Sequence, residues 1–198
     1  PILALDDPTS LATEAFRSLR TSLHFGMLDA SSKSIVITSA APVSGKSFSA
    51  VNLAVVLAQG GQRVCLIDAD LRRGHLRKYF NQPKNAYGLS QYLAEEKTLD
   101  EVIHKGPIDG ISFIGSGRFP PNPADLLMRP KLVELLTCLE KDFDLILIDT
   151  PPVMAVTDPV IVGRIAGGTL IVARYGVTQL AEIQATQHAL EGAGVNII

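Results

Sequence analysis

The chain alternates short apolar runs with longer segments whose apolar residues recur at helical spacing. In the segment that begins at Ser10, the residues Leu11, Ala15, Leu19 and Leu23 share one helical face. Strands that alternate with helices form a mostly parallel sheet with helices on both faces. We therefore predict one α/β domain over residues 1–198. The predicted strands are 34–38, 63–68, 111–115, 144–149 and 168–173, and the predicted long helices are 10–28, 45–59, 157–165 and 179–192.

Two stretches between these elements are less regular. Residues 74–105 predict short helices separated by loops around Pro83 and Gly88. Further along, Asn122 is expected to cap a helix that has Pro123 in its first turn. Pro130 is expected to break or restart that helix, which then runs to about residue 141.

The predicted strand 34–38 leads into a loop of small residues that resembles a phosphate-binding loop. Gly45, Lys46 and Ser47 match the end of the pattern G-x-x-x-x-G-K-[ST], but Ala40 occupies its leading position. Backbone N–H groups at the start of the next helix can bind phosphate, Lys46 can neutralise it, and the Ser47 hydroxyl can ligate Mg²⁺. The alternative is a plain strand–helix turn. The expected nucleotide-binding residues are Ala41, Pro42, Val43, Ser44, Gly45, Lys46, Ser47 and Phe48.

Three aspartates follow the ends of two other predicted strands. Asp68 and Asp70 follow one apolar run, and Asp149 ends another at the position of a Walker B acid. In a parallel sheet these ends share the edge that holds the phosphate loop. Two carboxylates beside a triphosphate require a cation, so we expect Mg²⁺ held by Ser47, Asp68 and Asp149. Lys46, Asp68, Asp70 and Asp149 are the candidate catalytic residues; either Asp68 or Asp70 can be the base, and Asp70 can instead cap a turn. These features predict a P-loop NTPase-like fold that binds ATP.

The composition of the chain argues against some classes of binding partner and metal site. The net charge of −2 and the absence of a basic stripe argue against nucleic acid. Cys65 and Cys138 lack paired or metal-like spacing, and Cys65 is expected in the core. No apolar run approaches the ~20 residues of a membrane helix.

Together the motifs resemble the cytoplasmic kinase domain of bacterial tyrosine kinases (BY-kinases), in particular the Wzc-like proteins of polysaccharide export. Residues 41–47 are similar to the Walker A motif of that family, residues 68–72 to its Walker A′ motif, and residues 149–152 to its Walker B motif. Residues 14–20 reproduce its E-x-x-R-x-x-R signature, and residues 117–128 are also similar. The resemblance spans essentially the whole chain.

The resemblance implies an ATP-dependent protein-tyrosine kinase that uses Mg²⁺. Family members autophosphorylate in trans a tyrosine-rich C-terminal tail of a neighbouring subunit, and they regulate polymerisation and export of exopolysaccharide or capsule. The implied partners are a homo-oligomeric ring, a transmembrane chain-length domain in cis or on another protein, and a cognate phosphatase. The implied location is the cytoplasmic face of the bacterial inner membrane.

The chain carries no tyrosine cluster of that kind. We expect the tail to lie beyond Ile198 and membrane segments before Pro1, so that the chain is a piece excised from a longer membrane-anchored protein. The tyrosines it does contain are scattered and expected to be structural. They are Tyr79, Tyr87, Tyr92 and Tyr175.

Two charged groups have alternative interpretations. Glu14, Arg17 and Arg20 form either an ion pair on a solvated helix face or, as the resemblance favours, the contact that closes the ring. A basic cluster forms either a solvated surface or a guide for an acidic or phosphorylated segment. Its members are Arg72, Arg73, His75, Arg77 and Lys78.

Two other functions compete with the kinase. A nucleotide-gated oligomerisation module of an export system needs only the loop, Mg²⁺ and Asp149. A positioning ATPase of the ParA/MinD type carries a signature lysine five residues before the invariant one, but that position here is Ala41. The missing lysine disfavours the positioning ATPase, and the acid pair favours the kinase.

Overall fold

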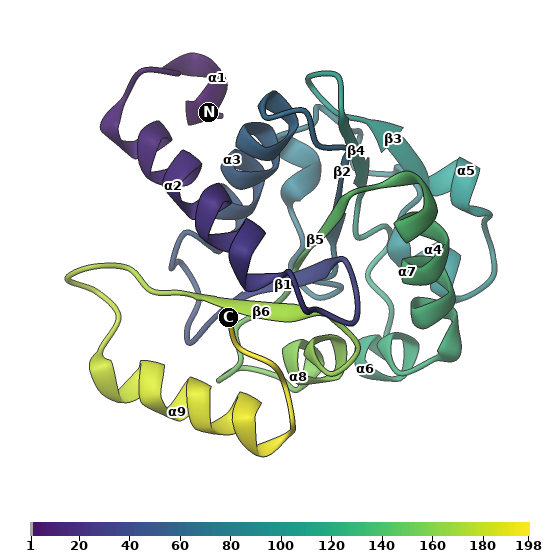
Figure 1. Cartoon of the computed structure of the whole chain (residues 1–198). Helices are drawn as coiled ribbons and strands as arrows, with labels where there is room; N and C mark the ends of the chain where they lie inside the picture. The colour runs from purple at the N-terminus through teal and green to yellow at the C-terminus, as the bar shows by residue number, and fades with distance from the viewer. Residues whose placement is uncertain (1) are drawn as a thin grey trace.

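A computed structural model describes residues 2–198 and shows a six-stranded sheet between layers of helices (Figure 1). The strand order is β3-β4-β2-β5-β1-β6. Each neighbouring pair is parallel except β3 and β4, which are antiparallel. The strands are β1 (Ser34–Ser39), β2 (Val64–Asp68), β3 (Ile103–Lys105), β4 (Ile111–Ile114), β5 (Leu145–Asp149) and β6 (Gly168–Val172).

Nine α-helices and one 3₁₀ helix lie before, between and after the strands within the described residues. The long helices α2, α3, α7 and α9 were predicted to within a few residues of their ends. The helices are α1 (Leu3–Asp6), α2 (Leu11–Gly26), α3 (Lys46–Gln59), α4 (Leu89–Leu93), α5 (Leu99–Val102), α6 (Pro123–Leu127), α7 (Pro130–Asp142), α8 (Asp158–Gly163) and α9 (Leu180–Gly192), and the 3₁₀ helix is Leu76–Lys78.

The two faces of the sheet are covered by different helices. Ile35, Ile37 and Leu147 pack with α2 and α3 on one face, whereas Val36 and Ile148 pack with α4, α6, α7 and α8 on the other. This separation follows from the alternation of side chains along a strand. Figure 1 shows α2 and α3 on the opposite side of the sheet from α6 and α8. The predicted mostly parallel sheet with helices on both faces is confirmed.

Three local features differ from the sequence prediction. Asn122 occupies the N-cap position of α6 with Pro123 in the first turn, as predicted, but its side chain makes no capping hydrogen bond within residues 2–198. The short helix α1 and the edge strand β3 were not predicted. Pro130 occupies the first turn of α7, so the helix restarts there as one of the two predicted outcomes.

Cys65 is buried in β2, as expected for a small core residue, and burial raises the pKa of its thiol. Among residues 2–198, none of the helices is long and apolar enough to cross a membrane.

Candidate functional site

The phosphate loop connects β1 to α3 in a backbone conformation that few residues adopt. Gly45 has φ 89° and Val43 has φ 63°, and the Val43 side chain is 80% exposed. A positive φ at a residue with a branched side chain is strained, and such strain gathers at ligand-binding loops. No side chain caps the N-terminus of α3, and its first helical bond is the Ser49 N–H to the Gly45 carbonyl. The earlier N–H groups are therefore available to an anion, as the sequence predicts.

Ser47 and Asp149 meet at the end of β5. The Ser47 hydroxyl donates a hydrogen bond of 2.6 Å to Asp149 Oδ2, and both residues are buried. The other carboxylate oxygen, Asp149 Oδ1, is buried without a hydrogen-bond partner among residues 2–198, and so is Ser44 Oγ in the phosphate loop. Unpaired buried oxygens are costly, and a carboxylate oxygen beside a serine hydroxyl is the donor set that Mg²⁺ prefers. The residues present therefore fit a magnesium ion.

The Asp149 carboxylate is held in an environment that disfavours its charge. Burial raises the pKa of Asp149 to about 6 against the opposing effects of the Lys46 charge and the Ser47 hydrogen bond. The nearby Asp70 carboxylate raises the same pKa. A bound Mg²⁺ ion would therefore stabilise the charged form of the Asp149 carboxylate.

Asp68 stands beside Asp149 in the register of β2 and β5. Its Oδ1 accepts the Asp70 N–H at 3.2 Å and its Oδ2 accepts the Leu76 N–H at 3.0 Å. Burial and the neighbouring Asp149 charge raise the pKa of Asp68 well above its ordinary range. A Cβ on Gly74 would lie 2.7 Å from Asp68 Oδ1. Asp68 therefore organises the turn that follows β2, here called the A′ turn (residues 69–75), and only glycine fits at position 74.

Asp70 lies in the A′ turn and uses one oxygen. Its Oδ1 accepts the N–H groups of Arg72 at 3.1 Å and Arg73 at 2.9 Å, which is the turn-capping geometry that the sequence left open. The element directly after this turn is the 3₁₀ helix Leu76–Lys78 and not the expected α-helix. Asp70 Oδ2 accepts no hydrogen bond from the described residues. Asp70 can therefore hold the turn and still accept a proton.

The three aspartates do not form a complete metal cage. Among the residues that the structure describes, no group of three or more His, Cys, Asp or Glu side chains is arranged to hold a metal ion. Mg²⁺ commonly uses one or two carboxylates and takes its other ligands from water and phosphate. The arrangement of Ser47, Asp68 and Asp149 is compatible with this second type of site.

An ion pair between Arg72 and Asp158 fixes the A′ turn to α8. Arg72 Nε and Nη2 donate to the two carboxylate oxygens of Asp158 at 2.9 and 3.1 Å, and the Asp158 side chain is fully buried. Asp158 was not among the site residues predicted from the sequence. Its place in the first turn of a predicted helix was visible, but the partner that lies 86 residues away was not.

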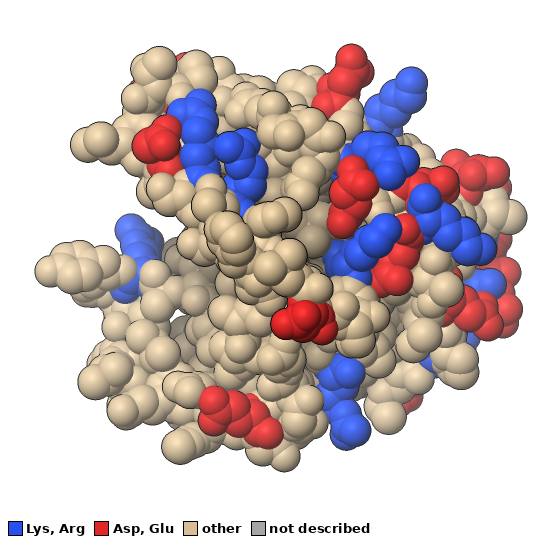
Figure 2. Space-filling view, viewed as in Figure 1, with Lys and Arg blue, Asp and Glu red and all other residues tan. Residues whose placement is uncertain are grey.

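The charged residues of α2 are mostly engaged within the chain. Arg17 pairs with Glu14 at 2.9 Å and donates to the Pro8 carbonyl, whereas Arg20 donates to the Val56 carbonyl of α3 at 3.0 Å. Figure 2 shows acidic and basic side chains side by side over α2. The ion pair that one interpretation expected is present in this structure. The intersubunit contact stays a prediction.

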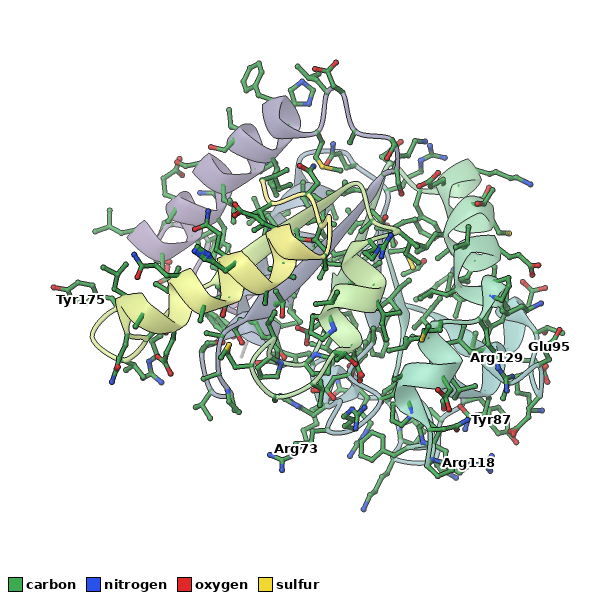
Figure 3. The ribbon with its side chains drawn as sticks, turned by 90° about the horizontal axis from the view of Figure 1, so that it is seen from below. Arg73, Tyr87, Glu95, Arg118, Arg129 and Tyr175 are labelled. Atoms are coloured by element: carbon green, nitrogen blue, oxygen red, sulfur yellow. The ribbon has the colours of Figure 1, made fainter. Side chains whose placement is uncertain are left out.

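The four tyrosines differ in exposure. Tyr92 is buried and Tyr79 is half-buried, which agrees with a structural role. Tyr87 is 48% exposed below the Lys97 ammonium. Tyr175 is fully exposed in the loop between β6 and α9, and it points away from the body of the molecule (Figure 3). The expected structural role is wrong for Tyr175.

Comparison with known proteins assigns the chain to a family. A family model described as an AAA domain matches residues 32–193. The tyrosine-protein kinase etk of Escherichia coli (strain K12) is 46% identical over 197 residues, and the match covers 100% of this chain and 27% of that protein. The solved kinase domain of the Escherichia coli tyrosine kinase ETK superposes with a TM-score of 0.95 at 46% identity, covering 100% of this chain and 77% of that one. The chain belongs to the bacterial tyrosine kinase family.

Further relatives of this kinase domain agree with that assignment. The tyrosine-protein kinase wzc of Salmonella typhimurium is 42% identical over 196 residues, with 99% of this chain and 27% of that protein covered. The septum site-determining protein MinD from Pyrococcus horikoshii, solved with Mg-ADP, has a TM-score of 0.70 at 23% identity and covers 84% of this chain and 68% of that one. The likeness to MinD shows the fold alone. The chain spans 27% of the length of the two curated relatives.

Proposed function

We propose that the chain transfers the γ-phosphoryl group of ATP to tyrosine. The observation that carries the proposal is the Ser47–Asp149 pair, whose unpartnered buried Asp149 Oδ1 lies beside an uncapped helix N-terminus. Kinship with tyrosine-protein kinases over the whole chain supports it. A nucleotide site of this kind, together with a second carboxylate turn, is what phosphoryl transfer to a hydroxyl requires.

The chain's own residues divide the work of binding. The phosphate loop amides and Lys46 hold the β- and γ-phosphates, and Ser47, Asp68 and Asp149 hold Mg²⁺ directly or through water. Mg²⁺, when bound, neutralises negative charge that develops on the phosphate oxygens. The Phe48 ring packs edge-on against Phe16 at 6.2 Å, so Phe48 contributes its backbone N–H and not its ring.

Asp70 accepts the phenolic proton in this proposal. Both oxygens of Asp68 accept backbone N–H groups, whereas Asp70 keeps Oδ2 without a hydrogen bond. Asp70 is also the more exposed of the two, at 8% against 1%. A base must be reachable by the incoming hydroxyl, so the geometry favours Asp70.

The proposed acceptor, assembly and cellular role of the whole protein are taken from its kinship with the tyrosine-protein kinases. The acceptor is a tyrosine-rich C-terminal tail of a neighbouring subunit in a ring that forms through Glu14, Arg17 and Arg20. The whole protein acts at the cytoplasmic face of the bacterial inner membrane with a transmembrane chain-length domain in cis or on a partner. There it regulates exopolysaccharide or capsule polymerisation and export, and a cognate phosphatase reverses the modification.

A transfer assay in trans tests the reaction. This chain and Mg-ATP are mixed with a Lys46→Met version of the protein that extends to its natural C-terminus, and phosphotyrosine is then probed. Label on the inactive partner, absent when both copies carry Lys46→Met, is expected. No label despite measurable ATP binding would replace the kinase with the nucleotide-gated oligomerisation module.

Light scattering tests the ring contact. Arg17→Ala is the variant of choice, because Arg20 also bonds to α3 and its loss would disturb the subunit itself. A smaller oligomer at unchanged helix content is expected. An unchanged oligomer would leave Glu14 and Arg17 as a surface ion pair, worth only ~0.3–0.5 kcal/mol.

A further inference from the structure

A basic cavity lies beside the A′ turn on the side of β4. Its volume is about 400 Å³. Its lining includes Arg73 and Gly74 of the A′ turn, His104 of β3, Phe113 of β4 and the residues after β4. In Figure 3, Tyr87 and Arg118 lie close together on the same side of the molecule as Arg73. The cavity therefore opens at the sheet edge that carries the candidate active site.

The lining of this cavity is positively charged. No aspartate or glutamate lines it, and the only ion pair made by a lining residue within residues 2–198 is that of Arg118 with Glu96 at 3.1 Å, on the exposed surface. Such exposed pairs are weak. The remaining cations create a positive potential that attracts an anion. The lysine, arginine and histidine residues of the lining are Arg73, His75, Arg77, Lys78, Lys84, His104 and Arg118.

The cavity also has aromatic walls and an unpaired polar atom. Phe113, Phe119 and Tyr87 line it, and Phe113 is held in place by stacking on Phe80 at 4.2 Å. His104 Nε2 is buried without a hydrogen-bond partner, so it can bond to an incoming ligand. The volume lies within the ~300–1,000 Å³ range of pockets that enclose organic ligands, and a bare phosphate would leave most of it empty.

The same turn connects the cavity to the proposed base. The Arg73 N–H donates to Asp70 Oδ1 at 2.9 Å, and the Gly74 N–H donates to the Asp70 carbonyl at 2.8 Å. Arg73 and Gly74 also line the cavity. A peptide bound in the cavity therefore contacts the turn that carries Asp70.

We propose that this cavity binds a phosphotyrosyl side chain of the substrate segment. The inference rests on the proposed function and names its substrate more closely. A phosphotyrosine carries a charge of about −1.5 to −2 at neutral pH and an aromatic ring, which match the basic and aromatic lining. A tyrosine that is already phosphorylated anchors the segment and places a neighbouring tyrosine at Asp70. Phosphorylation of a tyrosine cluster then proceeds more readily after its first event.

Calorimetric titration with phenyl phosphate tests the cavity without any transfer. The test variant is Arg77→Gln with Lys84→Gln, which removes two lining cations that have no acidic partner. The matched control is Lys141→Gln with Arg164→Gln, which removes two exposed cations outside the cavity. We expect phenyl phosphate to bind the test variant at least about tenfold more weakly and the control normally. Equal affinity for the test variant, or wild-type affinity for inorganic phosphate as high as for phenyl phosphate, would overturn the assignment.

Peptide kinetics separate this inference from the proposed function. Two peptides each present one acceptor tyrosine, with phosphotyrosine in one and phenylalanine in the other at the neighbouring position. The phosphotyrosine peptide is expected to have the lower KM with the wild-type chain, and Arg77→Gln with Lys84→Gln is expected to remove that advantage only. Equal KM values would overturn the docking role. Transfer to neither peptide would refute the kinase proposal, while the titration would still decide what the cavity binds.

Discussion

The Asp149 carboxylate should lower the stability of the protein when metal and nucleotide are absent. Its pKa is raised from 3.8 to about 6. Between these values the unfolded chain has lost the Asp149 proton while the folded protein retains it. The unfolded state therefore binds fewer protons, and the free energy of unfolding falls as the pH rises. Above the folded pKa the cost is constant at about 3 kcal/mol, because each pH unit of difference corresponds to about 1.4 kcal/mol.

Calorimetry of the wild type and Asp149→Asn in EDTA measures this cost. The variant is not charged at this position, so its stability relative to the wild type should increase from pH 5 to pH 8 by about 1.4 kcal/mol. For a domain of this size that difference corresponds to about 3–6 °C in Tm. Loss of repulsion on Asp68 acts in the same direction.

Asp144→Asn is the matched control for this experiment. Arg63 hydrogen-bonds the Asp144 carboxylate and lowers its pKa, so its contribution is complete above the unfolded pKa and is lost only at lower pH. The Tm difference between this variant and the wild type should stay constant from pH 5 to pH 8. A constant difference for Asp149→Asn as well would show that the carboxylate is not destabilised by burial, and the argument for a cation at Oδ1 would fail.

Three further substitutions test the A′ turn. Asp70→Asn should retain nucleotide binding and lose transfer; unchanged transfer in the peptide assay would exclude Asp70 as the base. Gly74→Ala places a methyl group against the Asp68 carboxylate, so it should lower Mg-dependent transfer and Tm together, and a wild-type Tm would contradict the packing. Arg72→Ala leaves the Asp158 carboxylate buried and unpaired, which should cost about 2–4 kcal/mol in urea denaturation. The Arg72→Lys variant, which keeps the charge but not the two-bond geometry, should recover only part of that loss.

Much of the fold was predictable because hydrophobic periodicity reports which face of an element is buried. The five predicted strands are short, mostly buried apolar runs, and the predicted helices α2 and α7 each have one apolar face; all of these elements were found. The strand β3 has three residues and pairs antiparallel at the sheet edge, so its period is too short to detect. Asn122 stands at the predicted N-cap position but makes no capping hydrogen bond, because a capping residue type does not fix the orientation of its side chain.

Only the part of the candidate site that lies at the ends of predicted strands could be predicted from the sequence. Asp68 and Asp149 end apolar runs, so the topology of a parallel sheet brings them to one edge. Nothing in the local sequence shows that Arg72 bonds to Asp158 or that Gly74 packs against Asp68, because these contacts depend on the folded path of the chain. The sequence also left Asp68 and Asp70 equivalent, and only their hydrogen bonds distinguish them.

The A′ turn follows a different strand from the phosphate loop, so nucleotide binding and phosphoryl transfer depend on largely different residues. The phosphate loop lies between β1 and α3, and Asp149 ends β5, whereas the proposed base belongs to the turn after β2. That turn shares only Asp68 with the proposed Mg²⁺ site and is fixed to α8 through Asp158. Mutations of Asp70 itself can remove the base while the phosphate loop and Asp149 still bind nucleotide. A lineage could in this way lose phosphoryl transfer and remain an ATP-dependent switch. Loss of nucleotide binding first would remove both functions, because transfer requires bound ATP.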